Sequence, residues 1–170
     1  MPGESKEPVL IVEGLTARFG DNVVFENVNF KVYRGEILVV VGASGCGKST
    51  LLKIMIGLQT PAAGKVLYQG MDIVRATEKE LLSYRQNIGV LFQSSALFSS
   101  MTLKENIALP LEEYARLDPA MTDMIIKMKL GMVNLAGYEN HSPAELSGGM
   151  KKRAGIARAM ALDPQVLFLD

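Results

Sequence analysis

The residues with the clearest chemistry lie in one glycine-rich run, Gly42-Ala43-Ser44-Gly45-Cys46-Gly47-Lys48-Ser49. This run fits G-x-x-x-x-G-K-[ST], the pattern of a loop that binds the phosphates of a nucleotide. Glycines allow such a loop to wrap closely around phosphate, with successive backbone N–H groups pointing inward. Lys48 would reach the β and γ phosphates, and the Ser49 hydroxyl would ligate the Mg²⁺ ion that bridges them. The pattern therefore predicts a site for a nucleoside triphosphate and Mg²⁺.

Such a loop must lie between a buried strand and a helix. Residues 37–41 are continuously apolar, which is typical of a strand covered on both faces, and we predict this strand over residues 36–41. From residue 48 onward apolar residues recur at helical spacing, and Gly57 is the expected stop. A chance glycine-rich turn would not require this order of flanking elements, so the context supports a phosphate loop.

The other predicted elements indicate a fold that mixes strands and helices. Further strands are predicted over residues 9–15, 28–33, 88–92 and 166–169. Thr77 with Glu80, and Thr102 with Glu105, match the capping-box pattern and predict the starts of two helices.

A helical lobe is expected over residues 102–130, with interruptions at Pro110 and at Asp118-Pro119. The side chains expected to pack its core are Met124, Met128 and Met132. A further helix is predicted over residues 148–161 and should end at Asp163-Pro164.

The composition limits the class of partner. The 170 residues include 18 basic and 18 acidic side chains, and a net charge of zero argues against nucleic-acid binding through a broad positive field. A single cysteine excludes an internal disulfide and fits the cytosol. The longest apolar run, residues 37–41, is far shorter than the roughly 20 residues that cross a bilayer. We expect a soluble chain, with residues 1–8 as a flexible tail rather than a secretory signal.

The pentapeptide that opens the last predicted helix, Leu146-Ser147-Gly148-Gly149-Met150, resembles the signature of ATP-binding-cassette (ABC) ATPases. In that family the usual sequence is Leu-Ser-Gly-Gly-Gln, and its serine and glycine N–H groups bind the γ phosphate held by a second subunit. The resemblance therefore implies a homodimer joined head to tail. An ordinary serine-capped helix start would explain Ser147 but not the paired glycines.

Three further features are similar to the same family. Leu167-Phe168-Leu169-Asp170 resembles the Walker B strand, which delivers a carboxylate to the magnesium shell. Gln93 resembles the glutamine that contacts magnesium and the attacking water, with a solvent-facing loop amide as the alternative. Phe19 resembles the aromatic residue that stacks on adenine, with Phe25 or simple core packing as alternatives.

The resemblance implies ATP and Mg²⁺ as ligands. The implied catalytic residues are Lys48, Gln93 and Asp170, and the implied Mg²⁺ ligands are Ser49, Gln93 and Asp170. The implied nucleotide-binding residues are Phe19, Gly42, Ser44, Gly45, Cys46, Gly47, Lys48, Ser49, Thr50, Ser147, Gly148 and Gly149.

The resemblance also implies an α/β fold with a P-loop NTPase (RecA-like) core, an N-terminal antiparallel β subdomain and a helical lobe. We place the nucleotide-binding core at residues 9–93, the lobe at 94–146, and the signature helix with the Walker B strand at 147–170. The general-base glutamate and switch histidine of the family would follow Asp170, so His141 is not the switch histidine. We therefore expect the last part of the fold to lie after Asp170, and the 170 residues alone to hydrolyse ATP negligibly.

Residues 142–150, with Met150 in place of the usual glutamine, are similar to the Mla-type lipid-transport ATPases of Gram-negative bacteria. Those ATPases energise the movement of phospholipid or related apolar solutes between the inner and outer membranes. The resemblance implies integral membrane permease subunits as partners. It also implies a cytoplasmic location, peripheral on the inner membrane, with the membrane reached only through the permease.

Three other functions are compatible with part of the sequence. A non-transport ABC ATPase shares all these motifs, but a short lobe without heptads favours transport. A small P-loop kinase or GTPase is disfavoured because no Asn-Lys-x-Asp motif is present. A natural nucleotide-binding module without hydrolysis is the third alternative. The basic run Lys151-Lys152-Arg153 could bind an anionic surface or form a solvated helix face.

Overall fold

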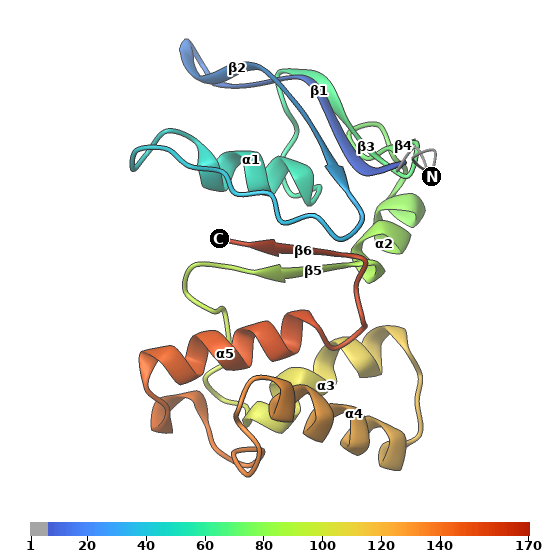
Figure 1. The fold of residues 1–170 in the computed structure, drawn as a ribbon, viewed down its shortest axis with the longest axis vertical. Coiled ribbons are helices and arrows are strands. Elements are labelled where there is room, and N and C mark those ends of the chain that lie inside the picture. The colour runs from blue at the N-terminus through green and yellow to red at the C-terminus, as the bar shows by residue number, and fades with distance from the viewer. Residues whose placement is uncertain (1–6) are drawn as a thin grey trace, which may run out of the picture. The chain divides into compact units, whose positions relative to one another are not determined.

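The computed structural model describes residues 7–170, so most of the predicted tail, residues 1–6, lies outside the described chain (Figure 1). The chain forms two compact units, one up to Tyr84 and the other from Arg85 on. The predicted boundaries after residues 93 and 146 both fall inside the second unit. The signature helix shares one apolar core with the lobe helices, which is why the structure does not separate them.

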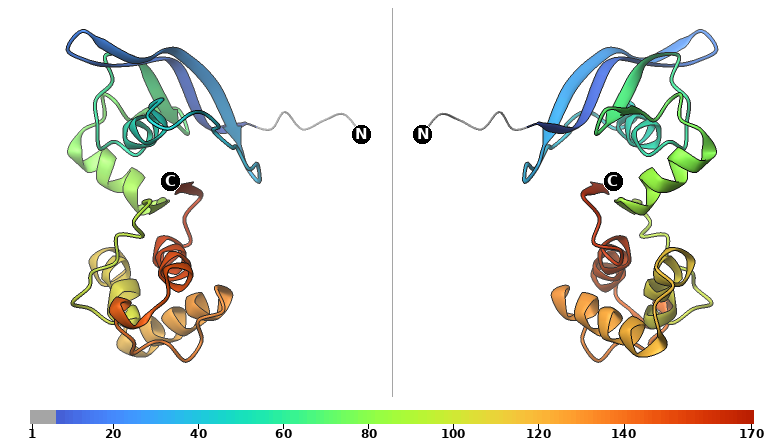
Figure 2. Two further views of the ribbon diagram at one scale, coloured as in Figure 1. Left: turned by 90° about the vertical axis from the view of Figure 1, so that its left-hand side faces the viewer. Right: turned by 90° about the vertical axis from the view of Figure 1, so that its right-hand side faces the viewer.

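The first unit is built on an antiparallel sheet with the strand order β2-β1-β3-β4, as Figure 2 shows from two sides. Its strands are β1 (Pro8–Phe19), β2 (Asn22–Tyr33), β3 (Ala63–Tyr68) and β4 (Met71–Asp72). The sheet confirms the predicted antiparallel β subdomain. Leu10, Val12 and Leu15 of β1 are almost fully buried and form the centre of this unit.

Two helices belong to the first unit, α1 (Lys48–Met55) and the start of α2 (Glu78–Gln86). The α1 helix ends where predicted, because Gly57 adopts a left-handed conformation with φ 70°. The Tyr84 hydroxyl donates a hydrogen bond to the carbonyl oxygen of Met55 at 2.7 Å, which fastens α2 to the end of α1.

The strand predicted over residues 36–41 is wrong, because the segment forms no strand in this structure. Ile37 is 90% exposed and Val41 is 87% exposed. An apolar run of this kind is typical of a strand that is buried on both faces within a parallel sheet. The strands of the first unit pair with one another in a separate antiparallel sheet, and none of them pairs with this segment.

The second unit contains a parallel strand pair and a helical lobe. Its elements are β5 (Ile88–Leu91), α3 (Leu103–Tyr114), α4 (Pro119–Met132), the 3₁₀ turn η1 (Pro143–Glu145), α5 (Gly148–Ala159) and β6 (Val166–Leu169). The strands and helices predicted for this half are therefore present. Pro110 lies inside α3 instead of interrupting it, because the buried face formed by Leu103, Ile107 and Leu111 holds the helix together.

The methionines of α4 do not pack the lobe, so that prediction is wrong. Met124 is 71% exposed, and Met128 and Met132 are also exposed. The helix carries two apolar stripes at helical spacing, and it is the other one, with Ile126 and Leu130, that faces the core. Periodicity identifies an apolar stripe but cannot tell which of two stripes is covered.

The start of α3 provides a test of the capping box. The N–H of Glu105 donates to the Thr102 hydroxyl at 3.2 Å, and the Glu105 carboxylate accepts from the N–H of Thr102 at 2.7 Å. We expect Thr102→Ala to lower the free energy of unfolding by about 1 kcal/mol, because a helix N–H loses its partner. Urea denaturation should show this loss, whereas Thr102→Ser should keep most of the stability. Equal stability of the two variants would contradict the role of the cap.

Candidate functional site

The phosphate loop leads directly into α1. Lys48, Ser49 and Thr50 are the first three residues of the helix, and residues 42–46 before it are exposed. Gly45 and Gly47 have φ values of 80° and 98°, in the left-handed region that other residues rarely adopt. The first turn of α1 contains no acidic side chain. The loop therefore presents the positive end of a helix dipole to solvent, which favours an anion.

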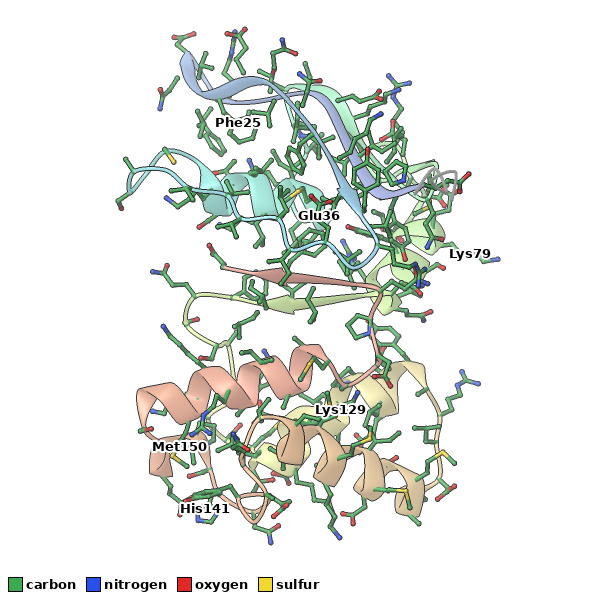
Figure 3. All side chains as sticks on the ribbon, viewed as in Figure 1. Phe25, Glu36, Lys79, Lys129, His141 and Met150 are labelled. Carbon is green, nitrogen blue, oxygen red and sulfur yellow. The ribbon has the colours of Figure 1, made fainter. Side chains whose placement is uncertain are left out.

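Strand β2 supports the loop from one side. A Cβ atom added to Gly47 would lie 2.5 Å from Cγ1 of Val24 and 3.0 Å from Cδ1 of Phe25. Figure 3 shows the Phe25 side chain between β2 and α1. Only glycine fits where β2 approaches the loop so closely. Gly47, the second fixed glycine of the motif, is therefore required both by its φ value and by the space around it.

Lys48 is held at the loop itself. Its ammonium donates hydrogen bonds to the carbonyl oxygens of Gly42 at 2.8 Å and Ala43 at 2.7 Å, and Sγ of Cys46 lies 3.8 Å away. The mouth of the loop thus combines backbone N–H groups with one positive charge. This arrangement can bind a multiply charged phosphate group.

The two aromatic residues considered for stacking on adenine differ in their surroundings. Phe25 is half-buried against Gly47. Phe19, at the end of β1, is 53% exposed. The ring of Phe19 is therefore the more available for stacking, and its contact with adenine stays a prediction.

In the second unit, Gln93 and Asp170 come to the same edge of the strand pair. Strands β5 and β6 run parallel, and the N–H of Asp170 donates to the carbonyl oxygen of Leu91 at 2.9 Å. Gln93 follows two residues after Leu91 and is exposed. The structure therefore places the amide and the carboxylate at the carboxyl ends of adjacent parallel strands. Lys48 and Ser49 belong to the first unit.

The signature pentapeptide forms the start of α5. The Ser147 hydroxyl accepts from the N–H of Met150 at 3.3 Å, and the helix has no acidic residue in its first turn. Gly148 and Gly149 are exposed, and a Cβ atom on either would meet nothing within 4 Å. The N-terminus of α5 is thus open to an anion.

Met150 lies where the family usually has glutamine. Its side chain is partly buried and packs against the apolar core of the lobe. Figure 3 shows it near the start of α5. Methionine at this position of the signature therefore serves as a packing residue of the lobe.

Sequence reasoning missed a third capping box, directly before the signature. The Glu145 carboxylate accepts from the N–H of Ser142 at 2.6 Å and from its hydroxyl at 2.8 Å. These hydrogen bonds lower the pKa of Glu145. The signal was present as Ser-x-x-Glu, the same pattern that predicted the starts of α2 and α3.

The histidine and the basic run have structural contacts. The ring of His141 packs on Tyr138 at 4.8 Å between centroids, and its carbonyl oxygen accepts from the N–H of Leu103. Arg153 donates to the carbonyl oxygens of Val133 and Asn134 at 3.0 and 3.1 Å. The arginine of the run therefore fastens α5 to the end of α4.

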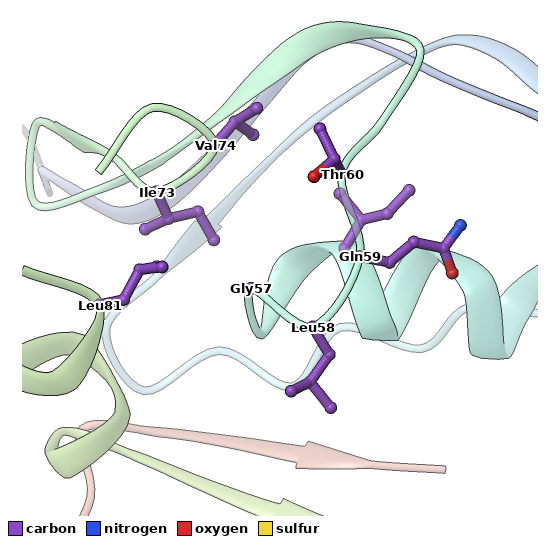
Figure 4. Close-up of a pocket in the computed structure, with 8 residues that line it drawn as sticks. Gly57, Leu58, Gln59, Thr60, Ile73, Val74 and Leu81 are labelled. Carbon is purple, nitrogen blue, oxygen red and sulfur yellow. The ribbon is translucent and has the colours of Figure 1, made fainter. Parts of the chain in front are cut away.

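A pocket of about 140 Å³ lies at the other end of α1 from the phosphate loop (Figure 4). Its lining includes Leu58, Ile73 and Leu81 and contains no ionisable side chain. It offers no ionisable group for proton transfer, so the phosphate loop remains the candidate site. Among residues 7–170, no helix has both the length and the apolar character needed to span a bilayer.

The chain is similar in sequence to several curated proteins. The chain is 44% identical to the probable ribonucleotide transport ATP-binding protein mkl of Mycobacterium leprae, over 99% of the chain and 49% of that protein. It is 43% identical to the intermembrane phospholipid transport system ATP-binding protein MlaF of Haemophilus influenzae, over 94% of the chain and 60% of that protein. The Escherichia coli protein of the same name is 39% identical, over 89% of the chain and 56% of the relative. The chain thus spans about half the length of these curated relatives.

The fold has similar solved structures. The ATP-binding cassette MJ0796, in a dimeric post-hydrolysis state bound to ADP and Pi, matches with a TM-score of 0.87 and 31% identity, over 95% of this chain and 73% of that one. This similarity confirms the predicted cassette fold. Residues 25–170, which include the phosphate loop and the signature, match the family model described as ABC transporter. The chain therefore belongs to the ABC transporter family.

Proposed function

We propose that the chain is the ATP-binding and ATP-hydrolysing part of a subunit that energises transport. The observation that carries this proposal is the loop at the start of α1, where left-handed Gly45 and Gly47 precede Lys48 and the Lys48 ammonium donates to two backbone carbonyls of the loop. An exposed helix start with an adjacent ammonium is suited to the β and γ phosphates of ATP.

The side chains predicted to bind Mg²⁺ have the donor chemistry that suits this ion. The Ser49 hydroxyl, the Asp170 carboxylate and the Gln93 amide all offer oxygen, which is the ligand atom that Mg²⁺ prefers. When bound, the ion would neutralise charge that develops on the phosphates. We assign Gln93 the further role of orienting the attacking water, since the amide lies exposed beside the end of β5.

A second copy of the protein completes each site in this proposal. The exposed glycines at the start of α5 offer N–H groups that can bind an anion. A head-to-tail homodimer would place the α5 start of one copy against the γ phosphate of the other. The dimeric state named for the similar cassette supports this arrangement.

Phospholipid or a related apolar solute is the proposed cargo, moved by a permease to which the ATPase binds from the cytoplasmic face of the inner membrane. The relatives from H. influenzae and E. coli, named for intermembrane phospholipid transport, support this cargo. Ribonucleotide transport is the second candidate, favoured by the name of the mycobacterial relative.

Co-purification of the complete gene product with an integral membrane permease is the first test. The complex, reconstituted in vesicles, should hydrolyse ATP faster with its phospholipid cargo than with added ribonucleotide. Stimulation by ribonucleotide alone would favour the second candidate. An active ATPase that binds no membrane protein would instead indicate a non-transport member of the family.

A further inference from the structure

A strained turn follows Gln93. The N–H of Ser95 donates to the carbonyl oxygen of Phe92 at 2.8 Å, which closes the turn around Gln93. Ser95 and Ala96 then both adopt left-handed conformations, with φ values of 64° and 48°. This region is unfavourable for residues other than glycine, and two consecutive residues rarely occupy it. The surrounding structure must therefore hold the turn in place.

Arg158 of α5 supplies that restraint. Its Nη1 donates to the carbonyl oxygen of Ala96 at 2.8 Å, and its Nη2 donates to the carbonyl oxygen of Ser95 at 3.2 Å. A planar guanidinium that binds two successive carbonyls fixes both their position and their orientation. A lysine could not reproduce this geometry, because it has a single point charge on a flexible stem.

Close packing strengthens the same connection. Gly155 lies one helical turn before Arg158, on the same face of α5. A Cβ atom on Gly155 would lie 2.6 Å from Cδ1 of Leu91 and 3.3 Å from Cβ of Ser95. Ser95 is only 4% exposed. The helix that begins at the signature is therefore packed directly on the turn that carries Gln93.

We propose that Arg158 is a positioning residue for Gln93, and that it makes the turn and helix α5 move as one body. This inference rests on the proposed function, in which Gln93 orients the attacking water. Through Arg158, a displacement of the signature end of α5 would also displace Gln93. If Arg158 only stabilised the fold, it would not influence turnover through the position of Gln93.

Arg153 provides a matched control on the same helix. It also donates to two successive backbone carbonyls, but these lie at the end of α4 and not in the turn after Gln93. In the ATPase expressed from the complete gene, we expect Arg158→Met to lower kcat by about 10- to 100-fold, with KM for ATP changed less than about 3-fold. We expect Arg153→Met to leave kcat within about 2-fold of the wild type, because it touches nothing near Gln93.

A double-mutant cycle separates positioning from general damage. In a Gln93→Ala background, Arg158→Met should lower kcat little further, because the group it positions is already gone. Independent losses that simply multiply would overturn the inference, and so would equal kcat values for Arg158→Met and Arg153→Met. If turnover by the wild type does not depend on Lys48, it is the proposed function that fails.

Hydrogen exchange tests the restraint without any turnover. The amide of Ser95 should exchange at least about 10-fold faster in Arg158→Met than in the wild type, because the turn opens more often. Arg153→Met should leave the exchange of this amide unchanged. Unaltered protection of Ser95 in Arg158→Met would show that the arginine does not hold the turn.

Discussion

Replacing Lys48 by alanine is expected to abolish saturable binding of Mg-ATP in calorimetric titration. The Lys48 ammonium lies at the phosphate loop, where it donates to the carbonyl oxygens of Gly42 and Ala43. Hydrogen bonds to charged groups contribute about 1.5–3 kcal/mol each. Loss of contacts to two phosphates should therefore raise the dissociation constant for Mg-ATP by about 100-fold or more.

Lys53 provides the control for this experiment. It lies on the same helix, is exposed, and is located in the last turn instead of the first. We expect Lys53→Ala to bind Mg-ATP like the wild type, because its charge is away from the loop. Equal binding by Lys48→Ala and the wild type would show that the phosphate loop is not the triphosphate site. GTP competing as well as ATP would bring back the GTPase alternative.

Elements with local signals could be predicted from the sequence. The starts of α2 and α3 follow from capping boxes at Thr77 and Thr102, since the hydrogen bonds involve residues only three positions apart. The phosphate loop is equally local, because glycines in left-handed conformations precede the helix within one run. Such patterns depend little on the rest of the fold, which is why they transfer from sequence to structure.

Features set by tertiary packing could not be predicted in the same way. Residues 36–41 have the composition of a buried strand, yet a strand exists only where a neighbour pairs with it. The exposed methionine stripe on α4 has the same periodicity as the covered stripe with Ile126 and Leu130. In both cases the sequence shows that the residues are apolar. Whether another element covers them depends on residues elsewhere in the chain.

The connection from Arg158 to the turn after Gln93 had no sequence signal at all. Ser95 and Ala96 are not typical of left-handed backbone, and Arg158 lies more than sixty positions further along the chain. The arginine side chain in a helix is most often solvated, so only the structure shows its carbonyl partners. The candidate site residues were predicted from motifs, whereas Arg158 and its contacts with the turn are found only in the structure.

The largest loss of stability is expected from Gly89→Ala in strand β5. A Cβ atom there would overlap the backbone carbonyl oxygen of Ala159 and lie 2.6 Å from Cδ2 of Leu167. The carbonyl belongs to the end of α5 and cannot rotate away, so either the strand or the helix must shift. We expect the free energy of unfolding to fall by about 3 kcal/mol, at the upper end for an overpacked core. Urea denaturation followed by circular dichroism measures this loss.

Gly131→Ala is the matched change in an open position. Gly131 is an exposed residue of α4, and a Cβ atom there would meet nothing within 4 Å. The same added methyl should raise the free energy of unfolding by about 0.5–1 kcal/mol, because alanine favours the helix over glycine. Opposite signs for the two substitutions would establish that α5 is pressed against β5, the strand that leads to Gln93. A loss below about 1 kcal/mol for Gly89→Ala would contradict this packing, since overpacked cores lose more.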